Sequence, residues 1–145
     1  MSVTTIYTMG KSRIEYDPSV PCLIARHIGF ELSHEHREFL NKGLELLIEK
    51  KKEQGKIAWV PDLRLSDAIM EEDSMWAVND WSPRALAAGV KHVAFILSED
   101  EFALASMASE TYNDAIKNDE QMQVGNFRDE ESAKEWLRES FSNEL

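Results

Sequence analysis

The spacing of hydrophobic residues changes near residue 30, and this change limits what the chain can fold into more than any other feature. Before it, apolar and β-branched residues alternate at period two in three runs, around Ile6–Tyr7, Ile14–Tyr16 and Cys22–Ile28. Alternation of this kind is typical of strands. The turn-forming pairs Gly10-Lys11 and Asp17-Pro18 separate the runs, so we expect three strands joined by two hairpin connections.

The next segment, Ser33 to Gln54, predicts a long helix. Ser33 is expected to cap its start, and Gly55 to end it in a left-handed conformation. Its apolar residues recur at intervals of three and four: Phe39, Leu40, Gly43, Leu44, Leu47 and Ile48.

Three strand–helix units are expected after this helix. The first is a strand over Ile57–Val60 that ends at Pro61-Asp62, followed by a helix over Met70–Asp80, a break at Trp81, and a further helix from Ser82 to Gly89.

The second unit has a strand over Val90–Leu97 and a helix opened by the capping-box pattern Ser98–Glu101. That helix carries Phe102, Ala105, Ser109 and Tyr112, and Lys117–Gln121 is expected to be a solvated connector. The third unit is a strand over Met122–Phe127 and a helix capped by Asp129, with Ala133, Trp136 and Leu137 facing inward. The prediction is an α/β fold, a mixed β-sheet with flanking helices in the order β-β-β-α-β-α-β-α-β-α, forming a single domain over residues 1–145.

Charge and composition exclude several classes of function. The 145 residues include 27 acidic and 16 basic ones, a net charge of −11, so binding to nucleic acid or an anionic membrane is not expected. The single cysteine, Cys22, excludes an internal disulfide and a cysteine-based zinc site. No apolar stretch approaches the roughly 20 residues that span a bilayer, and no signal peptide is evident, so we expect a cytoplasmic protein.

Motifs for nucleotide binding and for nucleophilic catalysis are absent from the sequence. It contains no Gly-x-Gly-x-x-Gly turn, no Gly-Lys-Ser/Thr pair and no Gly-x-Ser-x-Gly elbow, so no cofactor is expected. The most metal-like group is His34-Glu35-His36 with Glu38. Only His34 and Glu38 share a helix face, so we expect a hydrated first turn without metal. His27 and His92 fall in strand patterns and are expected at the strand surface.

Two groups of residues are candidates for a ligand site. Asp62 and Arg64 follow a predicted parallel strand, where α/β sheets place their ligands. They form either an ion pair that shapes the strand exit or a site in which Arg64 holds an anion and Asp62 acts as base or nucleophile. Trp76, Trp81 and Met75 either pack an irregular helix on the sheet or line an apolar pocket or partner surface.

Read in order, five segments of the chain resemble the SpoIIAA-like (STAS/SEC14-like) proteins of bacteria, over about Ile14 to Leu137. The segments are Gly43–Leu47, Trp59–Arg64, Trp81–Leu86, Ala88–Ala94 and Asn126–Leu137. The resemblance implies a mixed sheet flanked by helices. Its wider relatives include anti-sigma-factor antagonists, sulfate-transporter tails and lipid-carrying SEC14 domains.

The resemblance also bears on regulation by phosphorylation. The antagonists are switched at a serine in an Asp-Ser-Ser-Gly context, whereas here Asp73-Ser74 is followed by Met75-Trp76. The second serine and the glycine of that context are missing, so the resemblance does not imply the same switch here. If the protein is a regulatory domain, Ser74 and Ser66 are the candidate modified serines, because a phosphate at a helix start would gain from the helix dipole. No catalytic residue carries over from the family.

Three functions remain open from the sequence. The first is a non-enzymatic regulatory or protein-interaction domain, with a protein partner or a second copy of the chain as a homodimer. The second is a carrier of a small hydrophobic, amphiphilic or anionic ligand, using Trp76, Trp81, Met75 and Arg64. The third is an enzyme that uses Asp62 and Arg64, for which a second converging acid or base is needed.

Overall fold

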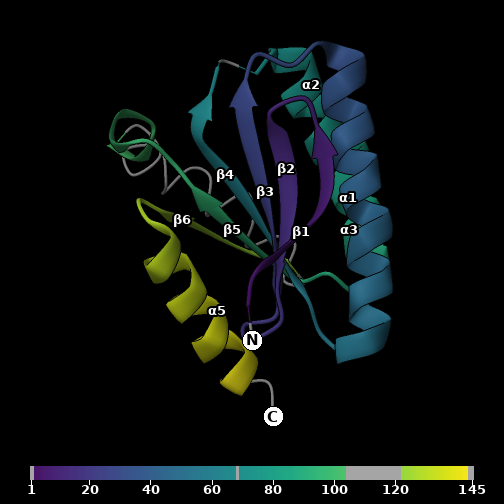
Figure 1. Ribbon diagram of the computed structural model, residues 1–145, viewed down its shortest axis with the longest axis vertical. Coiled ribbons are helices and arrows are strands. Elements are labelled where there is room, and N and C mark those ends of the chain that lie inside the picture. The colour runs from purple at the N-terminus through teal and green to yellow at the C-terminus, as the bar shows by residue number, and fades with distance from the viewer. Residues whose placement is uncertain (1, 68, 104–121, 144–145) are drawn as a thin grey trace.

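The computed structural model describes residues 2–67, 69–103 and 122–143 and contains one mixed six-stranded sheet (Figure 1). The strands lie in the sheet in the order in which they occur in the chain. They are β1 (Thr4–Met9), β2 (Ser12–Asp17), β3 (Cys22–Gly29), β4 (Ala58–Ser66), β5 (His92–Ile96) and β6 (Gln123–Phe127).

Strands β1, β2 and β3 pair antiparallel, and β3 to β6 pair parallel. Hairpins join the first three strands, and helices separate the parallel ones, as parallel pairing requires. The labelled helical segments are α1 (Ser33–Gln54), α2 (Glu71–Trp76), the π-helical turn η1 (Ala77–Trp81), α3 (Ser82–Ala87) and α5 (Glu130–Asn143), and residues 99–103 are also helical. The expectation of a mixed α/β sheet with flanking helices is confirmed.

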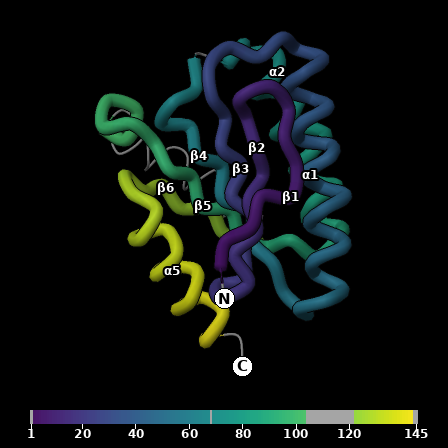
Figure 2. The backbone as a smooth tube through the Cα atoms, viewed as in Figure 1, coloured from purple at the N-terminus to yellow at the C-terminus, as the bar shows by residue number. Residues whose placement is uncertain are grey.

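The two faces of the sheet are covered by different helices. Figures 1 and 2 show α1, α2 and α3 on one face and α5 on the other. Alternate strand residues therefore enter two separate cores. The core under α1 includes Leu23, Ala25, Phe39, Leu47, Trp59 and Val93. The core under α5 includes Cys22, Ile24, Val60, Ala94, Ala133 and Leu137.

Helix α1 has the predicted bounds. Gly55 ends it at φ 82°, and its N–H bonds the Lys51 carbonyl, as expected for a left-handed cap. The capping residue differs from the prediction, because Leu32 rather than Ser33 occupies the N-cap position. The Ser33 hydroxyl instead donates to the Asp73 carboxylate at 2.9 Å, which ties α1 to α2.

Strand β4 is longer than predicted. Pro61 was expected to end it, but the strand continues to Ser66. A proline removes only one N–H donor from the ladder, and β4 keeps pairing with β3 on both sides of it, from Ala25↔Pro61 to Gly29↔Ser66, with one register shift. Asp62 and Arg64 consequently lie within the strand rather than beyond its end.

The predicted helix break at Trp81 is wrong. Trp81 has helical angles, φ −68° and ψ −48°, and the chain is helical from Glu71 to Ala87. The irregularity is a π turn instead, in which the Ser82 N–H bonds the Ala77 carbonyl five residues back. Pro83 follows directly, and the wider turn accommodates a residue that has no N–H to donate.

The second and third strand–helix units have the predicted order of elements, as far as the described residues show. Residues 99–103 are helical, and the Ser98 hydroxyl accepts from the Glu101 N–H at 3.3 Å. Ala105, Ser109, Tyr112 and Lys117–Gln121 lie outside the described residues. Asp129 caps α5 by accepting from the Ser132 N–H at 2.7 Å. Across the described ranges, every helix is too short or too polar to cross a bilayer.

Candidate functional site

A cavity of about 460 Å³ lies on the α1 face of the sheet. Strands β3 to β6 supply one side of its lining, and α1 with the α2–η1–α3 run supplies the other. Its lining is mainly apolar and includes Leu40, Trp59, Leu63, Trp81, Val93 and Phe95. Val78 lines the cavity and is also exposed, so the cavity reaches the protein surface beside η1.

Two histidines, His27 and His36, interrupt this apolar lining. His27 is the sixth residue of β3, where the strand's alternation turns it toward α1. His36 lies in the first turn of α1, and its main-chain N–H bonds the Leu32 carbonyl. Both are buried, with 2% and 5% of their surface exposed, and their ring centroids are 5.5 Å apart.

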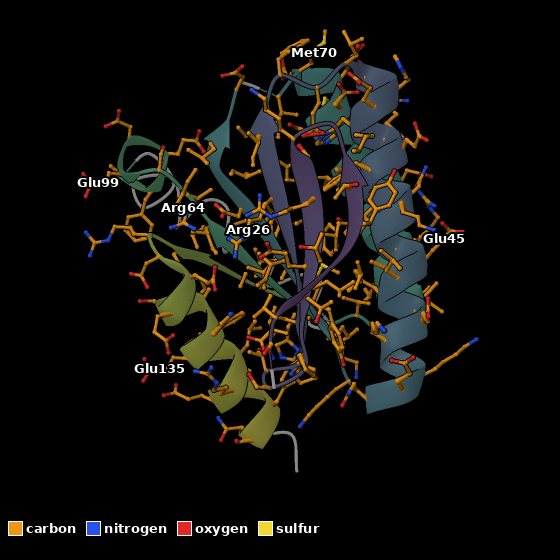
Figure 3. All side chains as sticks on the ribbon, in the orientation of Figure 1. Arg26, Glu45, Arg64, Met70, Glu99 and Glu135 are labelled. Atoms are coloured by element: carbon orange, nitrogen blue, oxygen red, sulfur yellow. The ribbon has the colours of Figure 1, made fainter. Side chains whose placement is uncertain are left out.

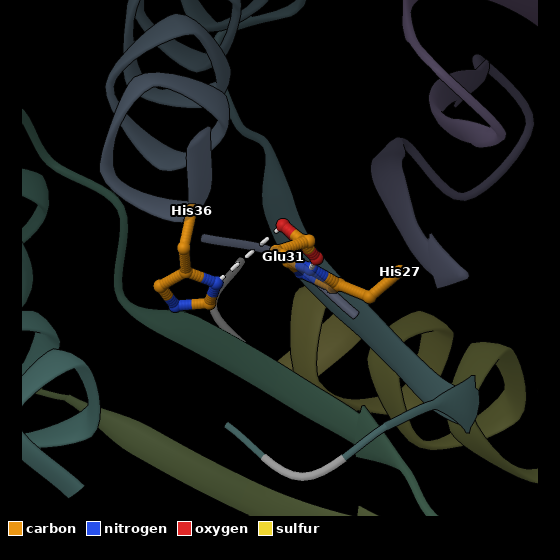
Figure 4. A group of neighbouring side chains, drawn as sticks. All are labelled: His27, Glu31 and His36. Atoms are coloured by element: carbon orange, nitrogen blue, oxygen red, sulfur yellow. Dashed lines mark hydrogen bonds and ion pairs between the residues drawn. The ribbon is translucent and has the colours of Figure 1, made fainter. Parts of the chain in front are cut away.

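Glu31, from the connection between β3 and α1, places its carboxylate between the two rings (Figure 4). His27 Nδ1 donates to Glu31 Oε1 at 2.6 Å, and His36 Nδ1 lies 3.6 Å from Glu31 Oε2. Glu31 Oε2 and His36 Nδ1 are buried and have no hydrogen-bond partner within the described part of the chain. The three side chains each offer a metal-binding atom, all within 4.8 Å of one another.

The electrostatics of this cluster favour an ionised carboxylate. Burial raises the pKa of Glu31, but the interactions with His27 and His36 outweigh it and lower the pKa to about 2. A buried carboxylate of this kind needs positive charge or hydrogen-bond donors on both oxygens. Oε1 has such a donor, whereas Oε2 faces the unpartnered His36 nitrogen.

Asp62 and Arg64 lie on the opposite face of the sheet, in a network of ion pairs with Arg26. Arg64 bonds Asp62 through Nε and Nη2, each at 2.9 Å, and Arg26 Nη1 reaches Asp62 at 2.8 Å. Arg26 also bonds Glu15 at 2.8 Å and Glu130 at 2.6 Å. Figure 3 shows Arg26 and Arg64 side by side, on the side of the sheet nearer α5.

This network leaves Asp62 poorly suited to catalysis. Burial raises its pKa, but the hydrogen bonds and charges of Arg64 and Arg26 outweigh this and lower it. Both carboxylate oxygens accept bonds from arginine, so no lone pair is presented to a substrate. Of the two interpretations of Asp62 and Arg64, the geometry favours the ion pair.

The aromatic candidates separate into different surroundings. Trp81 is buried, lines the cavity, and donates its indole N–H to the Leu40 carbonyl at 2.6 Å. Trp76 is half-buried, with the Arg37 and Arg84 guanidinium groups 5.2 and 5.7 Å from its ring. Met75 is 54% exposed. The sheet therefore separates Trp81 from Arg64, and the two do not share one pocket.

The two serine candidates also differ in position. Ser74 is exposed in α2 and lines the cavity, whereas Ser66 is half-buried at the end of β4, and its hydroxyl donates to the Asp67 carbonyl at 2.8 Å. Modification of either serine stays a prediction.

The sequence patterns missed the histidine cluster. His27 and His92 were expected at the surface, but both are buried, and the rings of Phe141 and Trp136 pack on His92. His36 was grouped with His34, its sequence neighbour, yet His34 is exposed and His36 faces β3. One signal was available, because His36 continues the apolar helix face at three residues before Phe39.

Comparison of the chain with protein-family models, curated proteins and solved structures found no match.

Proposed function

We propose that this protein binds a small, mostly apolar molecule in the cavity between the sheet and the α2–η1–α3 run. The observation that carries the proposal is the cavity itself, about 460 Å³ and lined by Trp59, Trp81 and aliphatic side chains. Ligand sites in proteins have this size and composition, with a few polar groups that orient the ligand.

His27 and His36 supply ring nitrogens to the lining, in addition to the hydroxyl groups of Ser74 and Ser82. With its Nδ1–H bonded to Glu31, the neutral His27 ring has Nε2 as an acceptor, so a ligand hydroxyl or protonated acid group would be favoured at this end. The function is therefore that of a carrier or sensor for an amphiphile, with an apolar body against the tryptophans and a polar end at the histidines.

Apolar side chains on the surface near the cavity mouth support this function. Met70, Met75 and Val78 are all exposed on α2, η1 and the residue before them (Met70 is labelled in Figure 3). An apolar ligand entering beside Val78 would pass over this methionine-containing surface.

The remaining predictions from the sequence fit this function without being required by it. They are membership of the SpoIIAA-like family, a single cytoplasmic domain, regulation through a partner protein or homodimer, and modification of Ser74 or Ser66. A phosphate on Ser74 would stand beside the cavity, so modification would act on ligand binding.

The test is titration of the purified full chain with 1-octanol and with N-phenyl-1-naphthylamine, an uncharged fluorescent probe, followed by intrinsic tryptophan fluorescence and calorimetry. Ala77→Phe fills the cavity from η1, and Ala87→Phe adds the same ring at an exposed position of the same helical run. We expect saturable binding of one probe per chain, retained in Ala87→Phe and reduced at least about tenfold in Ala77→Phe, a loss of about 1.4 kcal/mol.

Native mass spectrometry of the protein purified from its own host identifies the natural ligand by mass. Equal probe binding by wild type and Ala77→Phe, or no saturable binding by the wild type, would contradict the proposal. Circular dichroism of both variants confirms that they are folded.

A further inference from the structure

Three donor side chains from different segments converge at the wall of the cavity. His27 comes from β3, Glu31 from the connection that follows, and His36 from α1. Two histidines and one carboxylate, with the remaining side open, are the ligand set of catalytic zinc sites and of many iron(II) sites.

The distance between the two unpartnered atoms fits a shared ion. Two ligands about 2.1 Å from a tetrahedral zinc ion are roughly 3.4 Å apart. Glu31 Oε2 and His36 Nδ1 are 3.6 Å apart and face each other, and both are buried. The Glu31 side chain is 91% buried and that of His36 94% buried, from exposures of 9% and 6%.

We propose that His27, Glu31 and His36 bind a divalent transition-metal ion of the Zn²⁺ class. Glu31 Oε2 and His36 Nδ1 are the first two ligands, and the His27 ring moves slightly to complete the set, since all three donors already lie within 4.8 Å. The ion supplies the charge that the unpartnered carboxylate oxygen lacks.

The surroundings strengthen such a site. The Phe39 ring packs on His27 with centroids 4.9 Å apart, and Leu40 lies beside the histidines in the cavity lining. Apolar neighbours of this kind lower the local dielectric constant and strengthen the attraction between carboxylate and cation. Because His27 and His36 line the cavity, the open coordination position faces it, and an oxygen of a cavity ligand can occupy that position.

The experiment uses the full chain, stripped with a chelator, and titrated with Zn²⁺ by calorimetry and with Co²⁺ by visible absorption. We expect one ion per chain and a ligand-field spectrum of four- or five-coordinate Co²⁺. Glu31→Gln and His36→Gln each lower the association constant at least about tenfold. His34→Gln, an exposed histidine on the same helix, leaves it unchanged.

The wild type alone gives a second readout, which does not depend on variants that fold. Zn²⁺ should shift the imidazole nitrogen resonances of His27 and His36 in NMR spectra and leave those of His34 in place. Absence of saturable binding, or equal binding by wild type and Glu31→Gln, would overturn the metal site and show only weak attraction to an acidic surface. The metal site does not rest on the proposed function, because Ala77→Phe blocks the cavity and leaves all three donors in place, so each proposal fails separately.

Discussion

Gly43 lets α1 approach the sheet closely. A Cβ atom built there would lie 2.4 Å from Cη2 of Trp59, well inside van der Waals contact. Trp59 is buried at the centre of the α1 core and forms part of the cavity wall. The lack of a side chain at this one position therefore sets the distance between helix and strand.

Gly43→Ala should destabilise the protein although alanine favours helices. The helix preference contributes about 1 kcal/mol in favour of the variant, but overpacking against a buried indole costs about 1–3 kcal/mol. We expect a net loss of about 1 kcal/mol in urea unfolding. Glu45→Ala, at an exposed position of the same helix, is the control and should change stability by less than about 0.5 kcal/mol. A more stable Gly43→Ala variant would show that α1 shifts freely over Trp59.

At the scale of elements, the η1 turn joins two short helices into one run and attaches them to α1. The attachment is the hydrogen bond from the Trp81 indole to the Leu40 carbonyl, 2.6 Å long and buried. Trp81 also packs on Trp59, with ring centroids 5.4 Å apart. The π turn thus orients the residue that links the helices on this face.

Trp81→Phe removes the indole N–H that donates to the Leu40 carbonyl and keeps an aromatic ring at this position. The variant should lose about 1–3 kcal/mol of stability, because a buried carbonyl loses a partner and the smaller ring leaves a void. Trp136→Phe is the matched control on the α5 face, at a half-buried position. Chemical denaturation measures the loss of stability in each variant. Equal losses in Trp81→Phe and Trp136→Phe would mean that the indole N–H of Trp81 does not contribute to stability.

The elements were largely predictable from the sequence, because local spacing and caps determine them. Ser33–Gln54 repeats every three to four residues, and Asp129 caps α5 as expected. Two element boundaries were predicted wrongly, because residues elsewhere in the chain determine them. Strand β4 continues past Pro61 because it keeps pairing with β3. The helical run continues through Trp81, whose indole bonds the Leu40 carbonyl of α1. The cluster of His27 with His36 depends on tertiary packing, which the spacing of residues does not report.

At the scale of the whole molecule, one network of charges joins the first strands to the last helix. Arg26 on β3 bonds Glu15 on β2 and Glu130 on α5. Lys134 on α5 bonds Glu130 and Asp17, each at 2.8 Å. Burial raises the pKa of each of the carboxyls in this network, but hydrogen bonds and charges from Arg26, Lys134 and other partners outweigh it, so the net shift is downward.

Stability should therefore fall in acid. A carboxyl with a lowered pKa stabilises the fold above its ordinary value, 3.8 for Asp and 4.5 for Glu, and that contribution is lost as the pH falls through the folded pKa. The unfolded chain binds more protons in this range, so the free energy of unfolding should decline steadily below about pH 5. Urea midpoints between pH 7 and pH 3 measure the decline.

Arg26→Met tests whether this network is responsible. At pH 7 the variant should lose about 2–3 kcal/mol, because three carboxylates lose a shared partner at a largely buried site. The difference from wild type should shrink toward pH 3, where protonated carboxyls no longer attract a guanidinium. Arg138→Met, which removes an exposed pair with Glu131, should cost less than about 0.5 kcal/mol. If the stability difference between Arg26→Met and wild type does not change with pH, groups outside this network cause the acid sensitivity.

The order of strands in the sheet has a consequence for how the protein is made. Each strand lies next to the one synthesised before it, so a chain emerging from the ribosome can add strands one at a time to an edge that already exists. The face under α5 stays uncovered until that helix has been made, because α5 follows all six strands in the chain. Lys134 on α5 then reaches back to Asp17 on the second strand, so a helix made after all six strands is tied to a strand made early.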